Sequence, residues 1–358
     1  MQLDRVWLTD FRSYASAEVT LAPGLTAVVG ANGEGKSNLL EAIGWMGGLR
    51  SFRAAPTEAL VRVGAERAII RGEGSRAGRA LLIECEVAPG GRSRMLVNRQ
   101  PVRRVRDGLD FLRAVVFAPD DLELVKGGPG ERRGYLDDLL VALDPRLDAV
   151  RSDLDRILKQ RSALLKQAGG RLSDDVAPTL EVWDARLARA GEALADARSD
   201  LVILLGPVVE TAYQDLAGRG DVVLSYAPSW RPGGLLAALA EARRDELRRG
   251  VSLVGPHRDE LAITLAGLPA RTHASQGEQR TLALALRLAA ARQVAAVLDT
   301  PPLLLLDDVL SELDDDRAAG LLAHLPPGQT LITTATGLPS GTHPDLVLRV
   351  AGGSITPA

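Results

Sequence analysis

The stretch that most constrains this chain is the glycine-rich segment at residues 30–37, GANGEGKS, which matches the phosphate-loop pattern G-x-x-x-x-G-K-[ST] without a mismatch. An apolar run at 25–29 precedes it and a helical pattern at 38–46 follows it, so the segment has the strand–loop–helix setting that the pattern requires. Backbone N–H groups at the start of a helix form an anion site, and glycines let the backbone wrap a phosphate. The sequence therefore predicts an α/β fold with a nucleotide site at this loop.

Two side chains of the loop have specific predicted roles. Lys36 would reach the β- and γ-phosphates, and the Ser37 hydroxyl would bind Mg²⁺. ATP and Mg²⁺ are therefore the predicted cofactors. The predicted nucleotide contacts are Gly30, Ala31, Asn32, Gly33, Glu34, Gly35, Lys36, Ser37 and Asn38.

A second segment, residues 302–314 (PLLLLDDVLSELD), would complete the site from the other end of the chain. Four leucines followed by two aspartates indicate a buried parallel strand with acids at its carboxyl end, where open α/β sheets place their ligands. Asp307 is the predicted Mg²⁺ ligand, and Asp308 stands where a catalytic carboxylate would polarise the attacking water. The nucleotide domain is therefore predicted to be split by a long insertion.

The insertion has a helical pattern from residue 122 to about residue 217. An apolar seam with spacings of three and four runs along its second half, and a similar run from Leu147 to Leu164 is interrupted by Arg161. The two runs predict either a short antiparallel helical arm or an ordinary amphipathic helix pair on a globular core. The seam consists of Leu180, Trp183, Leu187, Ala190, Leu194, Ala197, Leu201 and Leu204.

The predicted domains follow from this pattern. An ABC-type ATPase domain would comprise residues 1–120 and 250–358, and a mainly helical arm would comprise residues 121–249. Three alternating stretches separated by turn signals predict an antiparallel sheet attached to the phosphate-loop half: 67–73, 80–87 and 94–97. Residues 261–265 also alternate and are expected to re-enter the main sheet.

Composition limits the classes of partner. The formal net charge of −3 gives no overall basic signal for nucleic acid, so any DNA surface must be a local patch. The single cysteine, Cys85, excludes an intramolecular disulfide. The first residues have no apolar signal core, and we expect no apolar run that approaches the roughly 20 residues of a membrane span. A cytoplasmic chain without a membrane partner is predicted.

The segment SQGEQ at 275–279 precedes a long Ala- and Leu-rich helix predicted for 276–298. A serine and a glycine at a helix N-terminus can bind an anion through a hydroxyl and backbone N–H groups. Ser275 with Glu278 three residues later also fits a capping box. Both interpretations stay open from this segment alone.

Taken together, these segments resemble the ABC-type ATPases of the SMC and DNA double-strand-break-repair kind. The resemblance covers nearly the whole chain, and two segments, at 117–137 and 255–260, go beyond any generic ATPase. It rests on FRSY at 11–14, GANGEGKSNLLEAI at 30–43, FAPDDLELVKGGPGERRGYLD at 117–137, GPHRDE at 255–260, SQGEQR at 275–280 and LLLLDDVLSELD at 303–314.

The resemblance implies a homodimer in which two subunits enclose two nucleotides head to tail. Ser275 and Gly277 would contact the γ-phosphate held by the partner, and Gln276 and Asp314 would lie at the dimer interface. Arg12 would lie near the bound nucleotide. The implied function is a weak ATPase of recombinational repair that loads on duplex DNA at gaps or single-strand/double-strand junctions. RecR and RecO, which help to load recombinase, are the implied protein partners.

Three departures from the family pattern predict slow hydrolysis. Asp308 stands where the catalytic residue is usually the longer glutamate. Residues 117–120 occupy the place of the usual Q-loop glutamine, and Thr334, Ala335 and Thr336 occupy the place of the switch histidine. ATP would then act mainly as an assembly switch. A rival function, the nucleotide-binding subunit of a transporter, is disfavoured because such subunits carry both missing residues and lack a long helical insertion.

Basic clusters suggest DNA contacts only weakly. Arg103 and Arg104, and Arg132 and Arg133, are the predicted contacts, with solvated or salt-bridged arginines as the alternative. His257 and Arg258 of the 255–260 segment would be either an exposed pair in a turn or residues near the nucleotide or the dimer seam.

Overall fold

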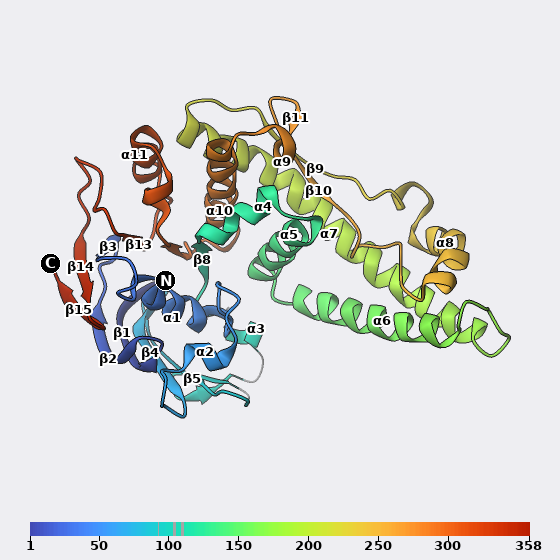
Figure 1. Cartoon of the computed structure of the whole chain (residues 1–358), viewed down its shortest axis with the longest axis horizontal. Helices are drawn as coiled ribbons and strands as arrows, with labels where there is room; N and C mark the ends of the chain where they lie inside the picture. Colours follow the sequence, from blue (N-terminus) through green and yellow to red (C-terminus); the bar gives the residue numbers. More distant parts are fainter. Residues whose placement is uncertain (92, 103–104, 109–110) are drawn as a thin grey trace. The chain divides into compact units, whose positions relative to one another are not determined.

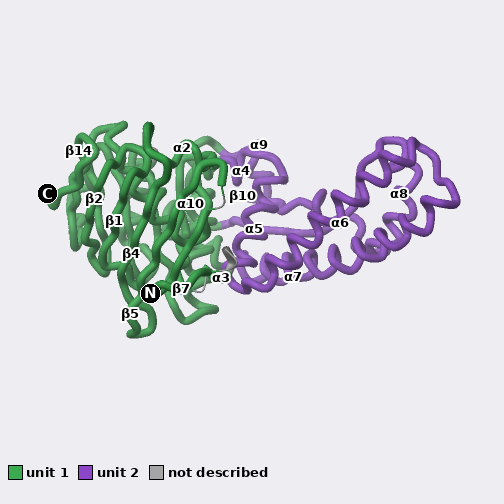
Figure 2. The backbone as a smooth tube through the Cα atoms, turned by 90° about the horizontal axis from the view of Figure 1, so that it is seen from below, with its two compact units in different colours: residues 1–122, 208–220, 275–358 green, residues 123–207, 221–274 purple. Residues whose placement is uncertain are grey.

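The computed structural model describes residues 1–91, 93–102, 105–108 and 111–358. The chain divides into two compact units (Figure 2). Unit 1 comprises residues 1–122, 208–220 and 275–358, and unit 2 comprises residues 123–207 and 221–274. Compared with the predicted division, unit 2 extends to residue 274, and the end of the long inserted helix groups with unit 1.

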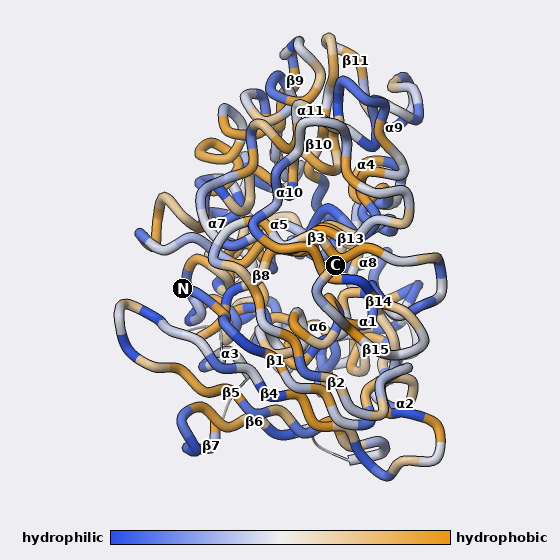
Figure 3. The backbone as a smooth tube through the Cα atoms, turned by 90° about the vertical axis from the view of Figure 1, so that its left-hand side faces the viewer, coloured by the Kyte–Doolittle hydropathy of each residue, from blue (hydrophilic) through white to orange (hydrophobic). Residues whose placement is uncertain are grey.

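A mostly parallel sheet with the order β15-β14-β3-β13-β12-β8 forms the centre of unit 1. Strand β3 lies between β13 and β14, which come from the last part of the chain, and only β15 runs antiparallel to its neighbour. Hydrophobic residues colour β3, β13 and β8 in Figure 3, as expected of strands covered on both faces. The strands are β3 (Leu25–Val29), β8 (Ala114–Phe117), β12 (Leu303–Leu306), β13 (Thr330–Thr334), β14 (Leu346–Ala351) and β15 (Ser354–Pro357).

An antiparallel sheet with the order β2-β1-β4-β5-β6-β7 forms a second layer of unit 1. Helix α1 (Lys36–Gly48) contacts strands of both sheets, and its apolar residues join one hydrophobic core with them. The predicted attached sheet is therefore present. Its strands are β1 (Gln2–Phe11), β2 (Tyr14–Thr20), β4 (Ala68–Arg76), β5 (Arg79–Val87), β6 (Arg94–Val97) and β7 (Gln100–Pro101), with short helices α2 (Thr57–Leu60) and α3 (Val105–Gly108) beside them.

The buried side chain of Gln329 joins the two sheets of unit 1. Its amide nitrogen donates to the carbonyl oxygens of Leu3 and Ala22, at 2.7 Å each, and its oxygen accepts from the Leu3 N–H at 2.8 Å. A buried amide with its hydrogen bonds satisfied costs little and fixes the register of the groups it joins. The first strand of the chain is thereby fixed to the loop that enters β13.

Helices α10 (Gln276–Leu298) and α11 (Asp315–Ala323) complete unit 1. By length and composition alone, α10 is apolar enough to cross a membrane, but Arg287 and Arg292 interrupt its apolar run. In addition, 67% of its most apolar window is buried inside the protein. This is the environment of a core helix, and α10 packs beside β8.

Unit 2 is mainly helical, as predicted for the arm. Helices α6 and α7 approach each other in Figure 1, and Leu165 of α6 shares a small core with Leu180 of α7 and Leu247 of α8. The helices are α4 (Glu123–Lys126), α5 (Pro129–Leu143), α6 (Leu147–Gln167), α7 (Ala177–Ala217, whose last residues belong to unit 1), α8 (Leu235–Arg249) and α9 (Ala270–His273).

Strand β10 (Leu261–Leu265) corrects one prediction. It does not re-enter the main sheet but pairs antiparallel with β9 (Val222–Tyr226) and β11 (Leu268–Pro269) inside unit 2. Leu261 and Ile263 are buried while Ala262 between them is exposed. This alternation suits a sheet with one covered face, whereas β12 and β13 at the centre of the parallel sheet are buried on both faces.

Arg161, which seemed to interrupt the apolar run of α6, is fully buried in unit 2. Its guanidinium donates to Asp184 Oδ1 at 2.7 Å, to Glu246 Oε2 at 2.6 Å and to Ser252 Oγ at 2.9 Å. The three acceptors lie on α7, on α8 and in the segment after α8. Arg161 therefore belongs to the core of the arm as an ion-pair centre.

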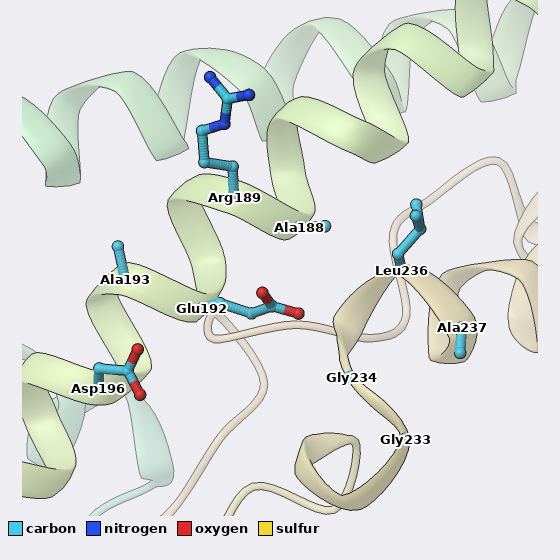
Figure 4. Close-up of a pocket in the computed structure, with 9 residues that line it drawn as sticks. All are labelled: Ala188, Arg189, Glu192, Ala193, Asp196, Gly233, Gly234, Leu236 and Ala237. Atoms are coloured by element: carbon cyan, nitrogen blue, oxygen red, sulfur yellow. The ribbon is translucent and has the colours of Figure 1, made fainter.

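A hollow on unit 2 lies between α7 and the start of α8 (Figure 4). Its lining combines Glu192, Asp196 and Arg189 with alanines, glycines and Leu236. Two carboxylates against one guanidinium leave the lining with net negative charge, which disfavours a nucleotide phosphate because like charges repel. The phosphate loop is therefore the better candidate for the nucleotide site.

Candidate nucleotide site

The phosphate loop connects β3 to α1 and has the backbone that its glycines allow. Gly33 and Gly35 have φ values of 85° and 115°, in the region that other residues rarely adopt. Gly30 is needed for space, because a Cβ there would lie 2.4 Å from the carbonyl oxygen of Val350. Glu34 anchors the loop to the same C-terminal hairpin, since its carboxylate accepts from the Gly352 N–H at 2.5 Å.

Lys36 begins α1, and its ammonium lies over the loop. It donates to the carbonyl oxygens of Gly30 and Ala31 at 2.8 and 2.9 Å. The side chain is buried, so the charge has few other partners. Phosphate oxygens brought to the loop would offer this ammonium stronger, charge-assisted hydrogen bonds.

Ser37 and Asp307 meet although they are 270 positions apart. The Ser37 hydroxyl donates to Asp307 Oδ1 at 2.8 Å. Burial raises the pKa of Asp307, while hydrogen bonds from Ser37 and Thr333 and the charge of Arg53 oppose this rise. A serine hydroxyl and an aspartate oxygen at hydrogen-bond distance are hard oxygen donors of the kind that Mg²⁺ takes, so the residues fit the predicted ion.

Asp308 follows directly and has an unusual backbone. Its φ of 49° lies in the left-handed region, and its N–H donates to Thr333 Oγ1 at 2.8 Å. Its Oδ1 is buried and has no hydrogen-bond partner in the part of the chain that the structure describes. An unpaired buried carboxylate oxygen is costly, and a water molecule between it and a bound phosphate would satisfy it.

The FRSY segment at 11–14 braces the loop and α1. Tyr14 is buried, which raises the pKa of its hydroxyl, and that hydroxyl donates to the Gly35 carbonyl oxygen at 2.9 Å. Arg12 donates two hydrogen bonds of 2.8 Å to the buried carboxylate of Glu41 on α1. Arg12 thus lies beside the phosphate-loop helix, and in this structure its guanidinium is held by Glu41.

Arg53 is a cation at the site that the sequence reasoning missed. Its Nη1 donates to Asn38 Oδ1 at 3.2 Å and lies 3.9 Å from Glu41 Oε2. It is partly exposed, and its charge acts on Asp307. Its only signal in the sequence was its position shortly after α1, and this signal is weak because the chain is rich in arginine.

The residues predicted for the dimer interface gather around Arg317. Ser275 caps α10 in a complete capping box with Glu278, so the cap interpretation of SQGEQ is confirmed. Asp314 caps α11 and pairs with Arg317 Nη1 at 2.7 Å. A Cβ on Gly277 would lie 3.3 Å from that same Nη1. Gln276, the first residue of α10, lies between Ser275 and Gly277.

Of the four arginines predicted to contact DNA, the two that the structure describes differ in burial and in partners. Arg132 is buried, donates twice to Glu260 at 2.7 and 3.0 Å, and also bonds backbone carbonyl oxygens of unit 2. Its assignment as a DNA contact is corrected, because a phosphate could reach it only by breaking these bonds. Arg133 is half-buried and donates to the Asp259 carbonyl oxygen at 2.7 Å, and burial lowers its pKa. Arg103 and Arg104 lie outside the described residues.

The 255–260 segment lies in unit 2. His257 Nε2 lies 3.1 Å from the Ser252 carbonyl oxygen, and burial lowers the pKa of its ring. Arg258 is exposed and donates to the same carbonyl oxygen at 3.2 Å. Asp259 accepts from the Tyr226 hydroxyl at 2.6 Å and from Trp230 Nε1 at 2.9 Å. These contacts join the segment to β9 and the turn after it.

Comparison with known proteins agrees with this geometry. The family model described as the RecF/RecN/SMC N terminal domain matches residues 2–336. The DNA replication and repair protein RecF of Streptomyces avermitilis is 48% identical over 94% of this chain and 93% of its own length. RecF of Kineococcus radiotolerans is 45% identical over 99% of both chains.

Solved structures agree as well. A structure of the recombination mediator protein RecF with ATP, from the RecFOR pathway, has a TM-score of 0.90 and 27% identity, covering 100% of this chain and 97% of that one. An Smc head domain from Pyrococcus furiosus, with a TM-score of 0.59 and 18% identity over 100% of this chain and 96% of that one, shares the fold. The chain therefore belongs to the RecF/RecN/SMC family of ABC-type ATPases and, within it, to the RecF proteins.

Proposed function

We propose that this chain is an ATP-dependent DNA-binding protein of recombinational repair. As a RecF protein, it is an ABC-type ATPase of DNA replication and repair. The observation that carries the proposal at this site is the hydrogen bond between Ser37 and Asp307. It joins the phosphate loop to an acid at the end of a parallel strand, which is the arrangement that holds a magnesium nucleotide in phosphate-loop ATPases.

The proposed hydrolysis uses side chains that already lie at the site. With a nucleotide bound, Lys36 would exchange its two loop carbonyl oxygens for β- and γ-phosphate oxygens, and Ser37 and Asp307 would hold Mg²⁺. When bound, Mg²⁺ supplies positive charge to the phosphate oxygens. The Oδ1 of Asp308 would orient the attacking water and accept its proton, while the water oxygen bonds to the γ-phosphorus and the bond to the leaving ADP oxygen breaks. Because the aspartate is one methylene shorter than the usual glutamate, we expect slow turnover.

The proposed dimer follows from the resemblance. Ser275 and Gly277 of one subunit would contact the γ-phosphate on the other, with Gln276 and Asp314 at the seam. The position of Ser275 and Gly277 at the N-terminus of α10 supports this role, since helix N-termini bind anions. ATP would then complete the interface, and slow hydrolysis would release it.

The proposed partners are duplex DNA, at gaps or single-strand/double-strand junctions, and the mediators RecR and RecO. The RecF protein solved with ATP is described as a recombination mediator of the RecFOR pathway, which supports this assignment. The similar proteins named above are repair proteins and an SMC head, so a transporter subunit is not favoured. We propose a cytoplasmic location.

Light scattering tests the proposal. The mass in solution is measured without nucleotide, with ADP and with ATP and Mg²⁺, for the wild type, Ser275→Arg and the control Ser173→Arg, an exposed serine of unit 2. We expect ATP to double the mass of the wild type and the control and to leave Ser275→Arg monomeric. A wild type that binds ATP and stays monomeric would remove the roles of Ser275, Gly277 and Asp314 across the interface.

A further inference from the structure

We propose that Thr333 is a positioning residue for ATP hydrolysis, because one hydroxyl holds both acids of the site. Its Oγ1 donates to Asp307 Oδ1 at 2.8 Å and accepts from the Asp308 N–H at 2.8 Å. The inference rests on the proposed function, in which these acids hold the ion and the water. It concerns a residue that neither the motifs nor the resemblance had assigned.

The parallel sheet explains why Thr333 meets these acids. Strands β12 and β13 pair in register up to Leu306 opposite Ile332. One step further along both strands brings Asp307 beside Thr333. The side chain is fully buried, and as a β-branched residue it has few χ1 rotamers available. The hydroxyl is therefore held at this place by the sheet before any ligand binds.

The two hydrogen bonds fix the direction of the hydroxyl proton. A hydroxyl has one proton to donate and two lone pairs with which to accept. Because the Asp308 N–H occupies a lone pair, the proton of Thr333 is left for Asp307 Oδ1. The same N–H bond holds the left-handed turn at Asp308, whose φ is 49°. That turn sets where the free carboxylate oxygen of Asp308 lies.

Thr333 gains importance when a metal ion binds. In the structure, Asp307 Oδ1 also accepts from the Ser37 hydroxyl at 2.8 Å. A cation bound by Ser37 and Asp307 requires the Ser37 proton to turn away, which leaves Thr333 as the side-chain donor that still orients the carboxylate. Outer partners of metal-binding carboxylates typically affect metal affinity by about 10- to 100-fold.

The neighbouring threonines do not supply this contact. The Thr334 hydroxyl donates to the Gly337 carbonyl oxygen at 3.0 Å and accepts from the Thr336 N–H at 3.2 Å. It therefore caps the turn after β13, at the place where a switch histidine was expected from the family pattern. Thr333, one position earlier, is the threonine that contacts Asp307 and Asp308.

The test separates metal binding from nucleotide binding. The affinity for a fluorescent ATP analogue, mant-ATP, is measured in EDTA and in Mg²⁺, and the ratio gives the gain due to the ion. Thr333→Val keeps the shape and removes the hydroxyl. We expect it to reduce the Mg²⁺-dependent gain by about tenfold or more, to leave the EDTA affinity unchanged, and to be rescued by Thr333→Ser.

Thr330→Val is the matched control, because Thr330 is a buried threonine at the other end of β13. A Thr333→Val variant with the wild-type gain would overturn the inference, and so would an equal loss in Thr330→Val. If Thr333→Val does not fold, Thr333→Cys takes its place, since it has similar size and only a weak donor. A wild type with no gain from Mg²⁺ would instead refute the metal site of the proposed function.

Discussion

Replacing Arg161 with methionine tests whether a buried ion-pair centre stabilises the arm. The guanidinium makes hydrogen bonds to Asp184, Glu246 and Ser252, and the side chains of both acids are at most 1% exposed. Methionine fills much of the same space without charge. The change therefore leaves two buried carboxylates with fewer partners.

The expected loss in the free energy of unfolding depends on the partners that Asp184 and Glu246 keep after the substitution. Asp184 keeps Arg243 at 2.9 Å, and Glu246 keeps the Leu253 N–H at 2.7 Å. Among the described residues, Asp184 then keeps one cationic partner, whereas Glu246 keeps only the backbone N–H. Breaking a buried pair from one side typically costs about 3–5 kcal/mol, because a charge is left without compensation. With roughly 2–4 °C per kcal/mol for a domain of this size, the melting temperature of unit 2 should fall by about 6–20 °C.

The assay is thermal unfolding followed by far-UV circular dichroism, which reports on the helices of both units, including those that Arg161 joins in unit 2. Arg156→Met is the matched control, since Arg156 lies on the same helix, its side chain is 70% exposed and it pairs with Asp153 three positions earlier. The triple variant with Asp184→Leu and Glu246→Leu should recover most of the loss, because it removes the uncompensated charges. A shift for Arg161→Met no larger than that of Arg156→Met would refute the reasoning.

Three further predictions concern pH, nucleotide and DNA. Burial lowers the pKa of His257 below its ordinary 6.5. The neutral ring therefore stabilises the folded state above pH 6.5, and this stabilisation is lost as the pH falls below 6.5. His257→Asn should flatten the dependence of the melting temperature on pH between about pH 7.5 and 5, and an unchanged pH profile would contradict this. Arg53→Ala should weaken mant-ATP binding in Mg²⁺ by about tenfold, the effect of one lost charge-assisted contact, whereas Arg50→Ala, the nearby arginine, serves as the control. Arg103→Glu with Arg104→Glu should weaken binding to a gapped duplex in fluorescence anisotropy and leave mant-ATP affinity intact; equal DNA affinity would exclude this pair.

Long periodic elements were predictable from the sequence because their signal is local. The helix predicted for 276–298 coincides with α10. The phosphate loop and the strand before Asp307 were also predictable, because glycines and an apolar run followed by acids have few other uses. The contact between Ser37 and Asp307 confirms that the two segments meet.

Residues whose partners are distant in the sequence were not predictable. Arg132 looked like a surface cation until Glu260, 128 positions away, was seen to bind it. Arg161 looked like a break in an apolar face, because its acids lie on two other helices. Thr333 had no motif of its own, and only the register of two parallel strands shows what its hydroxyl touches.

The position of β3 between strands from the far end of the chain has a consequence for protein synthesis. The Leu25 N–H donates to Asp345, 320 positions later, and both flanking strands of β3 follow residue 329. At typical elongation rates of roughly 5–20 residues per second, the phosphate loop waits about 15–60 s on the ribosome before its sheet can close. A nascent or truncated chain therefore has no complete nucleotide site. A complete nucleotide site therefore forms only after β14 has been synthesised.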